Sequence, residues 1–251
     1  MTILGAGGPE RIGVIIVAAG LSRRMGAIDK AFTSVLGRPL LAWAVDPFEH
    51  SPVVDEIVLA VHRQKVQQGR ALVFEQGWKK VTQVCRGGER RQDSVREALL
   101  RLQKCDWVAV HDGARPCVPP QLLLQGIEAA KETGAAVPGV PLTDTIKRVD
   151  DTGLVEGTVD RGGLWAIQTP QVFRYAILWA AYQSMGAEAT DDAVLVEQTG
   201  HRVRVFPGDR DNIKVTVAQD LPAVTALLQR MQVEHWPEHK SESTLATSPA
   251  L

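Results

Sequence analysis

The sequence has few cysteines, and none of them forms a recognisable pair. Its 251 residues contain three, Cys85, Cys105 and Cys117, and no two have the Cys-x-x-Cys spacing. Three scattered thiols argue against a disulfide framework and against a zinc site. They favour a reducing compartment, so we expect a cytoplasmic protein.

Long apolar runs and an excess of one charge are also absent. No apolar run reaches about 18 residues, so we expect no membrane span. Residues 1–11 lack the basic-then-apolar order of a signal peptide and are predicted to be a loose leader. With 28 lysines and arginines against 29 aspartates and glutamates, the net charge is −1. No overall basic field therefore points to nucleic acid.

Three familiar enzyme motifs are missing. In the first glycine-rich loop, five residues separate Gly20 from Gly26, which does not match the G-x-G-x-x-G fingerprint of dinucleotide oxidoreductases. The P-loop motif G-x-x-x-x-G-K-[ST] is absent, which argues against a P-loop kinase. The G-x-S-x-G elbow of α/β-hydrolases is absent as well.

The segments that are present alternate between strand and helix. The length allows a substantial core, and 45% hydrophobic with 23% charged residues is ordinary for a globular protein. Predicted strands cover residues 12–19, 53–61, 80–85, 107–110, 134–140 and 203–206. Predicted helices cover residues 38–45, 119–132, 173–185, 191–199 and 221–231, with one more after Ser94. This order predicts an α/β fold, a Rossmann-like and mostly parallel sheet flanked by helices.

The alternation is interrupted at residues 141–168. Short β-like pieces separated by turn signals resemble a protruding β-arm more than another strand–helix–strand unit. From residue 232 the chain is polar and contains serine, threonine and proline, which is typical of a loose tail. We therefore predict a single domain over 12–231, with loose tails at 1–11 and 232–251.

Polar residues follow the apolar strands in four segments, 20–30, 87–94, 112–115 and 209–214. Since the carboxyl ends of parallel strands meet at one edge of the sheet, these segments should converge there, where α/β sheets bind ligands. The first segment combines glycines with Arg23, Arg24 and Lys30, which suits a polyphosphate. The alternative is a solvated turn with incidental charges.

Asp112 comes directly after an apolar strand. An acid at a strand tip can hold a divalent metal or a ligand hydroxyl, but it can also cap a helix or pair with Arg115. His111 beside it is more often structural than metal-ligating.

The glycine pair at residues 87–88 precedes a helix. Free backbone N–H groups at a helix start can bind phosphate or a base. A tight turn with Asp93 or Ser94 as the N-cap is an equal alternative. In the β-arm, Lys147 and Arg161 could be charges that protect a sheet edge.

An ordered set of motifs, spread over residues 12–229, resembles one enzyme family. The motifs are Ala18-Ala-Gly-Leu-Ser-Arg-Arg-Met-Gly26 followed by Lys30, Gly87-Gly-x-x-Arg91-x-x-Ser94-Val95, His111-Asp-Gly-Ala-Arg-Pro116, Asp144-Thr-Ile-Lys147, Thr158-Val-Asp-Arg161-x-Gly-Leu-Trp165, Gln168-Thr-Pro-Gln171, Thr190-Asp-Asp192 and Asp211-Asn-Ile-Lys-Val-Thr216. The first motif indicates a nucleotidyltransferase. The whole set resembles the 2-C-methyl-D-erythritol 4-phosphate cytidylyltransferase family of the non-mevalonate isoprenoid pathway.

The resemblance implies an activity and its requirements. The family transfers CMP from CTP to methylerythritol 4-phosphate, giving 4-diphosphocytidyl-2-C-methyl-D-erythritol and pyrophosphate. It uses Mg²⁺, and its β-arm crosses to the second subunit of a homodimer. Thr145 and Arg161 would then serve the neighbour's site.

The resemblance also implies roles for individual residues. The positions matched to cytidine binding are Ala18, Ala19, Gly20, Gly88, Glu89 and Ser94. The positions matched to catalytic cations are Arg24 and Lys30 on the triphosphate and Lys214 near the transferred phosphate. The positions matched to methylerythritol phosphate are Asp112, Arg115, Thr145, Arg161 and Thr190. Asp112 is also the candidate metal ligand.

Two other functions fit parts of this pattern. A cytidylyltransferase for another polyol phosphate, such as ribitol 5-phosphate, would share the first loop and the cytidine residues. A non-catalytic nucleotide-binding module is a more distant alternative. The presence of Arg24, Lys30, Asp112 and Lys214 argues against it, because a binding module need not retain the cations that assist transfer.

Overall fold

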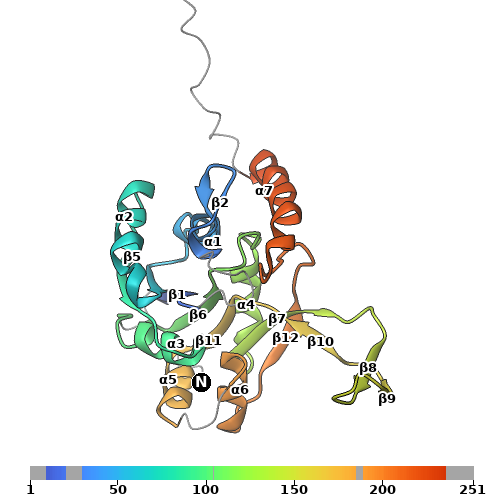
Figure 1. Cartoon of the computed structure of the whole chain (residues 1–251). Helices are drawn as coiled ribbons and strands as arrows, with labels where there is room; N and C mark the ends of the chain where they lie inside the picture. Colours follow the sequence, from blue (N-terminus) through green and yellow to red (C-terminus); the bar gives the residue numbers. More distant parts are fainter. Residues whose placement is uncertain (1–9, 21–29, 104, 185–188, 236–251) are drawn as a thin grey trace, which may run out of the picture.

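A computed structural model describes residues 10–20, 30–103, 105–184 and 189–235. An eight-stranded sheet forms the centre of the molecule (Figure 1). Its strands are β1 (Ile12–Ala18), β4 (Glu56–Val61), β5 (Val81–Arg86), β6 (Trp107–Asp112), β7 (Ala135–Pro141), β10 (Trp165–Ile167), β11 (Gln171–Arg174) and β12 (Arg204–Pro207). They lie in the order β10-β7-β11-β6-β1-β4-β5, and β12 pairs with β7.

The sheet is mostly parallel, as the sequence predicts. Strands β5, β4, β1 and β6 pair in parallel, and β12 is parallel to β7. Strand β11 lies antiparallel between β6 and β7. The sequence analysis wrongly assigned Phe173 and Arg174 to a helix. A strand of four residues is too short to show its own periodicity, and it continues directly into helix α5 (Tyr175–Gln183).

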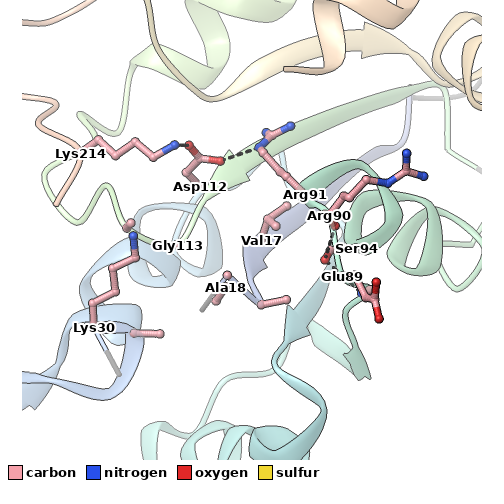
Figure 2. A pocket seen from close by; sticks show the side chains of 15 residues that line it. Val17, Ala18, Lys30, Glu89, Arg90, Arg91, Ser94, Asp112, Gly113 and Lys214 are labelled. Atoms are coloured by element: carbon pink, nitrogen blue, oxygen red, sulfur yellow. Dashed lines mark hydrogen bonds and ion pairs between the residues drawn. The ribbon is translucent and has the colours of Figure 1, made fainter. Parts of the chain in front are cut away.

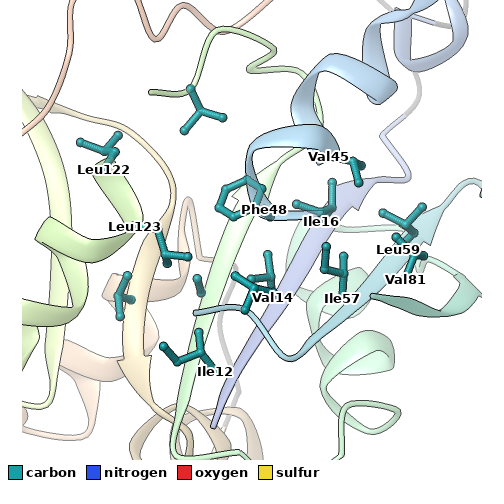
Figure 3. Close-up of a cluster of buried hydrophobic side chains, with 14 of the residues drawn as sticks. Ile12, Val14, Ile16, Val45, Phe48, Ile57, Leu59, Val81, Leu122 and Leu123 are labelled. Carbon is teal, nitrogen blue, oxygen red and sulfur yellow. The ribbon is translucent and has the colours of Figure 1, made fainter. Parts of the chain in front are cut away.

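Helices cover both faces of the sheet because successive side chains of a strand point to opposite sides. Val14 and Ile16 of β1 pack against one layer of helices, α1 (Leu40–Glu49), α2 (Val66–Gln76) and α4 (Leu122–Ala130), as Figure 3 shows for α1 and α4. Ile15 packs against the other layer, α3 (Arg91–Leu99), α5 and α6 (Asp192–Gln198). Apolar residues therefore occupy every position from 14 to 16, which explains the continuous run in the sequence.

Helix α2 was not predicted from the sequence. It is largely polar, buries Gly69 and Leu72, and leaves Phe74 88% exposed. Its apolar stripe is therefore too narrow to produce a clear helical period.

The last helix, α7 (Leu221–His235), continues past the predicted end at residue 231. Its Val224 and Leu228 pack with Leu40, Trp43 and Val215 in a third apolar cluster. This packing anchors the chain on either side of Lys214. At the other end, Glu10 accepts hydrogen bonds from Trp107 Nε1 and Arg174, so the end of the predicted leader is held against the body.

The segment predicted as a β-arm leaves the body of the molecule. Strands β8 (Ile146–Val149) and β9 (Val155–Val159) form a separate antiparallel pair that projects outward, and β10 returns to pair with β7 (Figure 1). Among the described residues, none of the helices has the length and apolar character of a membrane span.

Candidate active site

A cavity of about 180 Å³ lies at the carboxyl end of strands β1 and β6. Its walls come from the four segments that the sequence predicts to converge (Figure 2). The lining residues are Val17, Ala18, Ala19, Gly20, Lys30, Ala31, Gly88, Glu89, Arg90, Arg91, Ser94, Asp112, Gly113, Ala114 and Lys214. The predicted convergence is therefore correct.

The glycine pair before α3 allows this loop to pack closely against β1. A Cβ added to Gly87 would lie 2.2 Å from Cβ of Ala19. A Cβ added to Gly88 would lie 2.3 Å from Cβ of Asp93. Both distances are far below van der Waals contact. A side chain at position 87 would therefore push the loop away from Ala19, and one at position 88 would collide with the first turn of α3.

The hydroxyl group of Ser94 holds the same loop together. It accepts a hydrogen bond from the N–H of Gly88 at 3.1 Å and donates one to the carbonyl of Arg90 at 3.2 Å. Asp93 accepts the backbone N–H of Arg90 at 3.2 Å. Helix α3 therefore begins at Arg91, earlier than predicted, and Asp93 satisfies a backbone donor from within its first turn.

Asp112 is the buried charge at the centre of the site. Its Oδ1 accepts a hydrogen bond from Arg91 Nε at 3.0 Å, and its Oδ2 lies 2.6 Å from Lys214 Nζ. Figure 2 shows the two cations approaching the carboxylate from opposite sides. Burial opposes ionisation of Asp112, but Arg91, Lys214 and Arg115 outweigh it and hold its pKa well below the usual range.

Arg91 also binds a second carboxylate, on helix α6. Its Nη1 lies 2.7 Å from Oδ2 of Asp192, which is fully buried and accepts a hydrogen bond from Tyr182 at 2.5 Å. Burial opposes the charge on Arg91, but Asp192 and Asp112 raise its pKa. Neither Arg91 nor Asp192 was predicted as a site residue, although both stand in the quoted motifs. Only the fold shows that residues so distant in sequence form ion pairs.

His111 has a structural role, which the sequence favoured over metal binding. Its Nδ1 lies 3.0 Å from the hydroxyl oxygen of Thr169, and its Nε2 lies 3.1 Å from the carbonyl oxygen of Arg115. Since a carbonyl only accepts, Nε2 carries the proton, and Nδ1 accepts from Thr169. Burial lowers the pKa of His111 to about 4, so the ring is neutral at physiological pH.

The buried neutral His111 should make stability depend on pH. Its unfolded pKa is about 6.5, so the unfolded state binds more protons between the two pKa values, and stability falls as the pH falls. We expect a loss of about 3 kcal/mol of unfolding free energy between pH 7 and pH 4 from this residue. Urea denaturation at both pH values should show a smaller loss for His111→Gln. The exposed His201→Gln control should keep the wild-type loss, and an equal loss in both variants would contradict this assignment.

The cavity offers one buried carboxylate with which to hold a metal ion. Within the described ranges, no group of three or more His, Cys, Asp or Glu side chains is arranged to bind one. Asp112 already faces two cations, and Glu89, the other acid among the described residues of the cavity lining, is exposed. A single buried carboxylate suits only a Mg²⁺ ion that is bound mainly by substrate phosphates.

The other predicted site residues divide into several groups. Lys30 lines the cavity and donates from Nζ to the carbonyl of Val215 at 3.4 Å. Arg24 lies outside the described residues. Thr145 and Arg161 are exposed on the β-arm, and Thr190 lines a different cavity beside α6.

Arg115 is buried behind the cavity and does not line it. Its Nη1 donates to the carbonyl of Asn212 at 2.6 Å, and Asn212 Nδ2 donates to the carbonyl of Thr169 at 2.9 Å. Burial lowers the pKa of Arg115, with Asp112 acting in the opposite direction. In the structure Arg115 therefore connects the loop after β6 to the segment that precedes Lys214.

Comparison with known proteins assigns the chain to a family. The family model described as 2-C-methyl-D-erythritol 4-phosphate cytidylyltransferase matches residues 12–230. The chain is 47% identical over 221 residues to the enzyme of that name from Dehalococcoides mccartyi, covering 88% of this chain and 97% of the relative. It is 40% identical over 232 residues to the enzyme of that name from Geotalea uraniireducens, covering 89% and 99%.

Solved structures agree in fold. The 2-C-methyl-D-erythritol 4-phosphate cytidylyltransferase of Thermus thermophilus superposes with a TM-score of 0.71 at 33% identity, covering 87% of this chain and 99% of that chain. The 4-diphosphocytidyl-2C-methyl-D-erythritol synthase of Anaerococcus prevotii gives a TM-score of 0.77 at 28% identity, covering 89% and 100%.

Proposed function

The chain belongs to the 2-C-methyl-D-erythritol 4-phosphate cytidylyltransferase family, and from this premise we propose that it transfers CMP from CTP to 2-C-methyl-D-erythritol 4-phosphate. The products are 4-diphosphocytidyl-2-C-methyl-D-erythritol and pyrophosphate. One observation of the site carries the proposal: Lys30, Arg91 and Lys214 line one cavity with the Asp112 carboxylate, beside a closely packed glycine loop. Such a site suits two anionic substrates.

The reaction needs little acid–base chemistry from the protein. An oxygen of the phosphate monoester attacks the α-phosphorus of CTP, a new P–O bond forms, and the bond to the β-phosphate breaks. The monoester has a second pKa of about 6, so it is already mostly dianionic at neutral pH. In accord with this, the described residues that line the cavity include no histidine or cysteine.

What the reaction requires is relief from repulsion between two polyanions. Fixed cations at the reacting phosphates stabilise the charge that grows on the α-phosphorus and on the leaving pyrophosphate. Arg24, Lys30 and Lys214 are proposed for this role. Asp112 is proposed to orient the Lys214 ammonium group, which is supported by their 2.6 Å contact.

The cytosine base is proposed to lie at the glycine-loop side of the cavity. The candidate contacts are the backbone of Ala18, Ala19, Gly20 and Gly88 together with Glu89 and Ser94. The close packing of Gly87 against Ala19 supports the proposal that this side of the cavity accepts a pyrimidine and excludes a larger purine. We expect CTP to be preferred over GTP by about 100-fold in kcat/KM.

Mg²⁺ is proposed as the cofactor, held by Asp112 and the substrate phosphates. When bound, it neutralises phosphate charge and orients the leaving group. Removal of Mg²⁺ with EDTA should therefore abolish pyrophosphate release and leave the melting temperature of the substrate-free protein unchanged. Full activity in EDTA would contradict the proposal, and re-addition of Mg²⁺ is the control.

A homodimer formed through the β-arm is proposed from the arm's exposed apolar side chains. Leu154 and Val155 are 69% and 60% exposed, and an isolated two-stranded sheet is marginally stable in water. A second subunit would cover this surface. Thr145 and Arg161 of one subunit would then lie near the cavity of the other.

Charged substitutions on the arm should separate the subunits. We expect Leu154→Asp/Val155→Asp to be monomeric by analytical ultracentrifugation and to lose most activity, because the arm residues would no longer reach the neighbouring site. Leu100→Asp, at an exposed leucine on the body, should remain dimeric and active. A dimeric arm variant would contradict the arm interface.

A cytoplasmic location is proposed from the cysteines. Cys85, Cys105 and Cys117 are free thiols, as is usual in a reducing compartment.

Pyrophosphate release with CTP and Mg²⁺ tests the function directly. Release with methylerythritol 4-phosphate but not with ribitol 5-phosphate is the expected result. Release with ribitol 5-phosphate alone would retain the chemistry and overturn the substrate. No release with either acceptor would overturn catalysis and favour a nucleotide-binding module.

A further inference from the structure

The Arg91 guanidinium connects three elements of the fold at the rim of the cavity. Arg91 is the first residue of α3, and its two carboxylate partners are Asp112 at the end of β6 and Asp192 at the start of α6. Tyr182 of α5 binds the far side of Asp192. One side chain therefore fixes the strand tip relative to two helices.

The electrostatics require this arrangement. The two carboxylates that accept from Nε and Nη1 compensate the burial of the Arg91 charge. Within the described part of the chain, the third nitrogen, Nη2, is buried without a hydrogen-bond partner. Asp192 is fully buried, and its carboxylate accepts hydrogen bonds from Arg91 and Tyr182. A buried pair that loses one member leaves an uncompensated charge, so neither acid can easily take another position.

We propose that Arg91 is a positioning residue for cytidylyl transfer: it holds the Asp112 carboxylate facing Lys214 and fixes helix α6 to the strand tip. This inference rests on the proposed function and adds a residue to its machinery. Thr190, a candidate for the acceptor substrate, lies two positions before Asp192. Arg91 thus joins the transfer side of the site to the segment that would bind the acceptor.

The geometry requires an arginine. Nε reaches Asp112 at 3.0 Å while Nη1 reaches Asp192 at 2.7 Å, so one planar group donates in two directions. The single ammonium of lysine is a point charge without this fork. Arg91→Lys should therefore retain the charge and lose the orientation.

Steady-state kinetics, in which the concentrations of both substrates are varied, distinguish a role of Arg91 in positioning from a role in binding CTP. Arg91→Lys and Arg91→Ala should each lower kcat/KM for methylerythritol 4-phosphate by about 10²-fold, the effect of a small misplacement of reacting groups. The Kd for CTP, measured by calorimetry without acceptor, should stay within about 3-fold. Arg101→Gln, which removes an arginine from a surface ion pair with Glu97, should be unchanged in both.

Chemical rescue provides a readout that a purely structural role would not change. Guanidinium chloride at low millimolar concentration should restore activity to Arg91→Ala and not to Arg91→Lys, whose side chain fills the site. Wild-type kinetic constants in Arg91→Ala, or a folded variant that guanidinium does not rescue, would overturn the proposal.

Asp192→Asn provides a second test in case Arg91→Ala fails to fold. Asparagine has nearly the same shape as aspartate, so this variant removes the charge and keeps the packing. We expect a fall of about 10-fold in kcat/KM for the acceptor with CTP affinity unchanged. An unchanged kcat/KM would overturn the link to α6. Inactivity of the wild-type protein with methylerythritol 4-phosphate would instead indicate failure of the proposed function.

Discussion

Lys214→Ala is expected to lower kcat by about 10²- to 10³-fold, the usual effect of removing one preorganised charge that faces the transition state. Lys214 Nζ lies 2.6 Å from Asp112, and this ion pair orients the ammonium group at the cavity wall. In the variant, the negative charge that grows on the α-phosphoryl group and on pyrophosphate would no longer be stabilised by the Lys214 ammonium group. Pyrophosphate release at saturating CTP and methylerythritol 4-phosphate measures the effect directly.

Two comparisons separate this effect from a change in folding. Lys131→Ala removes another lysine of an ion pair, with Glu128 on the surface of the molecule, and should retain full activity. The unfolding free energy of Lys214→Ala should change little, because the lysine is 40% exposed and Arg91 still compensates Asp112. A Lys214→Ala variant with near-normal kcat would exclude the catalytic role.

Lys30→Ala is expected to lower kcat far more than it weakens CTP binding. Lys30 belongs to the short 3-10 helix η2 (Lys30–Phe32), and its Nζ donates to the carbonyl of Val215, the residue after Lys214. The two lysines proposed to be catalytic therefore line the same cavity. A cation that interacts more strongly with the transition state than with bound CTP changes kcat more than Kd. We expect a loss of about 10²-fold or more in kcat.

CTP titration by calorimetry, paired with steady-state kinetics, measures the two quantities separately. Lys131→Ala, which removes the surface lysine paired with Glu128, is again the control and should keep both constants. A Lys30→Ala variant whose Kd rises as much as its kcat falls would show that Lys30 only binds the nucleotide.

Much of the fold could be predicted because its central strands carry strong local signals. Residues 14–16 are apolar without interruption since β1 is buried on both faces, and the turns that follow are marked by glycine and by charge. The four polar segments converge because the carboxyl ends of parallel strands share one edge. The cavity could therefore be located, and Lys30, Asp112 and Lys214 assigned to it, before the structure was considered.

Elements with weak local signals were missed. Strand β11 spans four residues, so its identity depends on its neighbours β6 and β7. Helix α2 exposes Phe74 and buries only Gly69 and Leu72. Its sequence therefore shows little of the apolar periodicity that packing of a helix against a core produces. In both cases tertiary contacts override the local preferences of the chain.

By itself, the sequence determined the fold class, the family and the sheet edge at which the ligands would bind, because periodicity and motif order are properties of the chain. The tertiary structure alone decided which charges pair. From the sequence, Asp112 could have capped a helix or paired with Arg115, and the structure places its carboxylate between Arg91 and Lys214. Arg91 meets Asp192 only after α3 and α6 have packed on the same face of the sheet. Ion pairs over such separations depend on distance and burial, which folding creates.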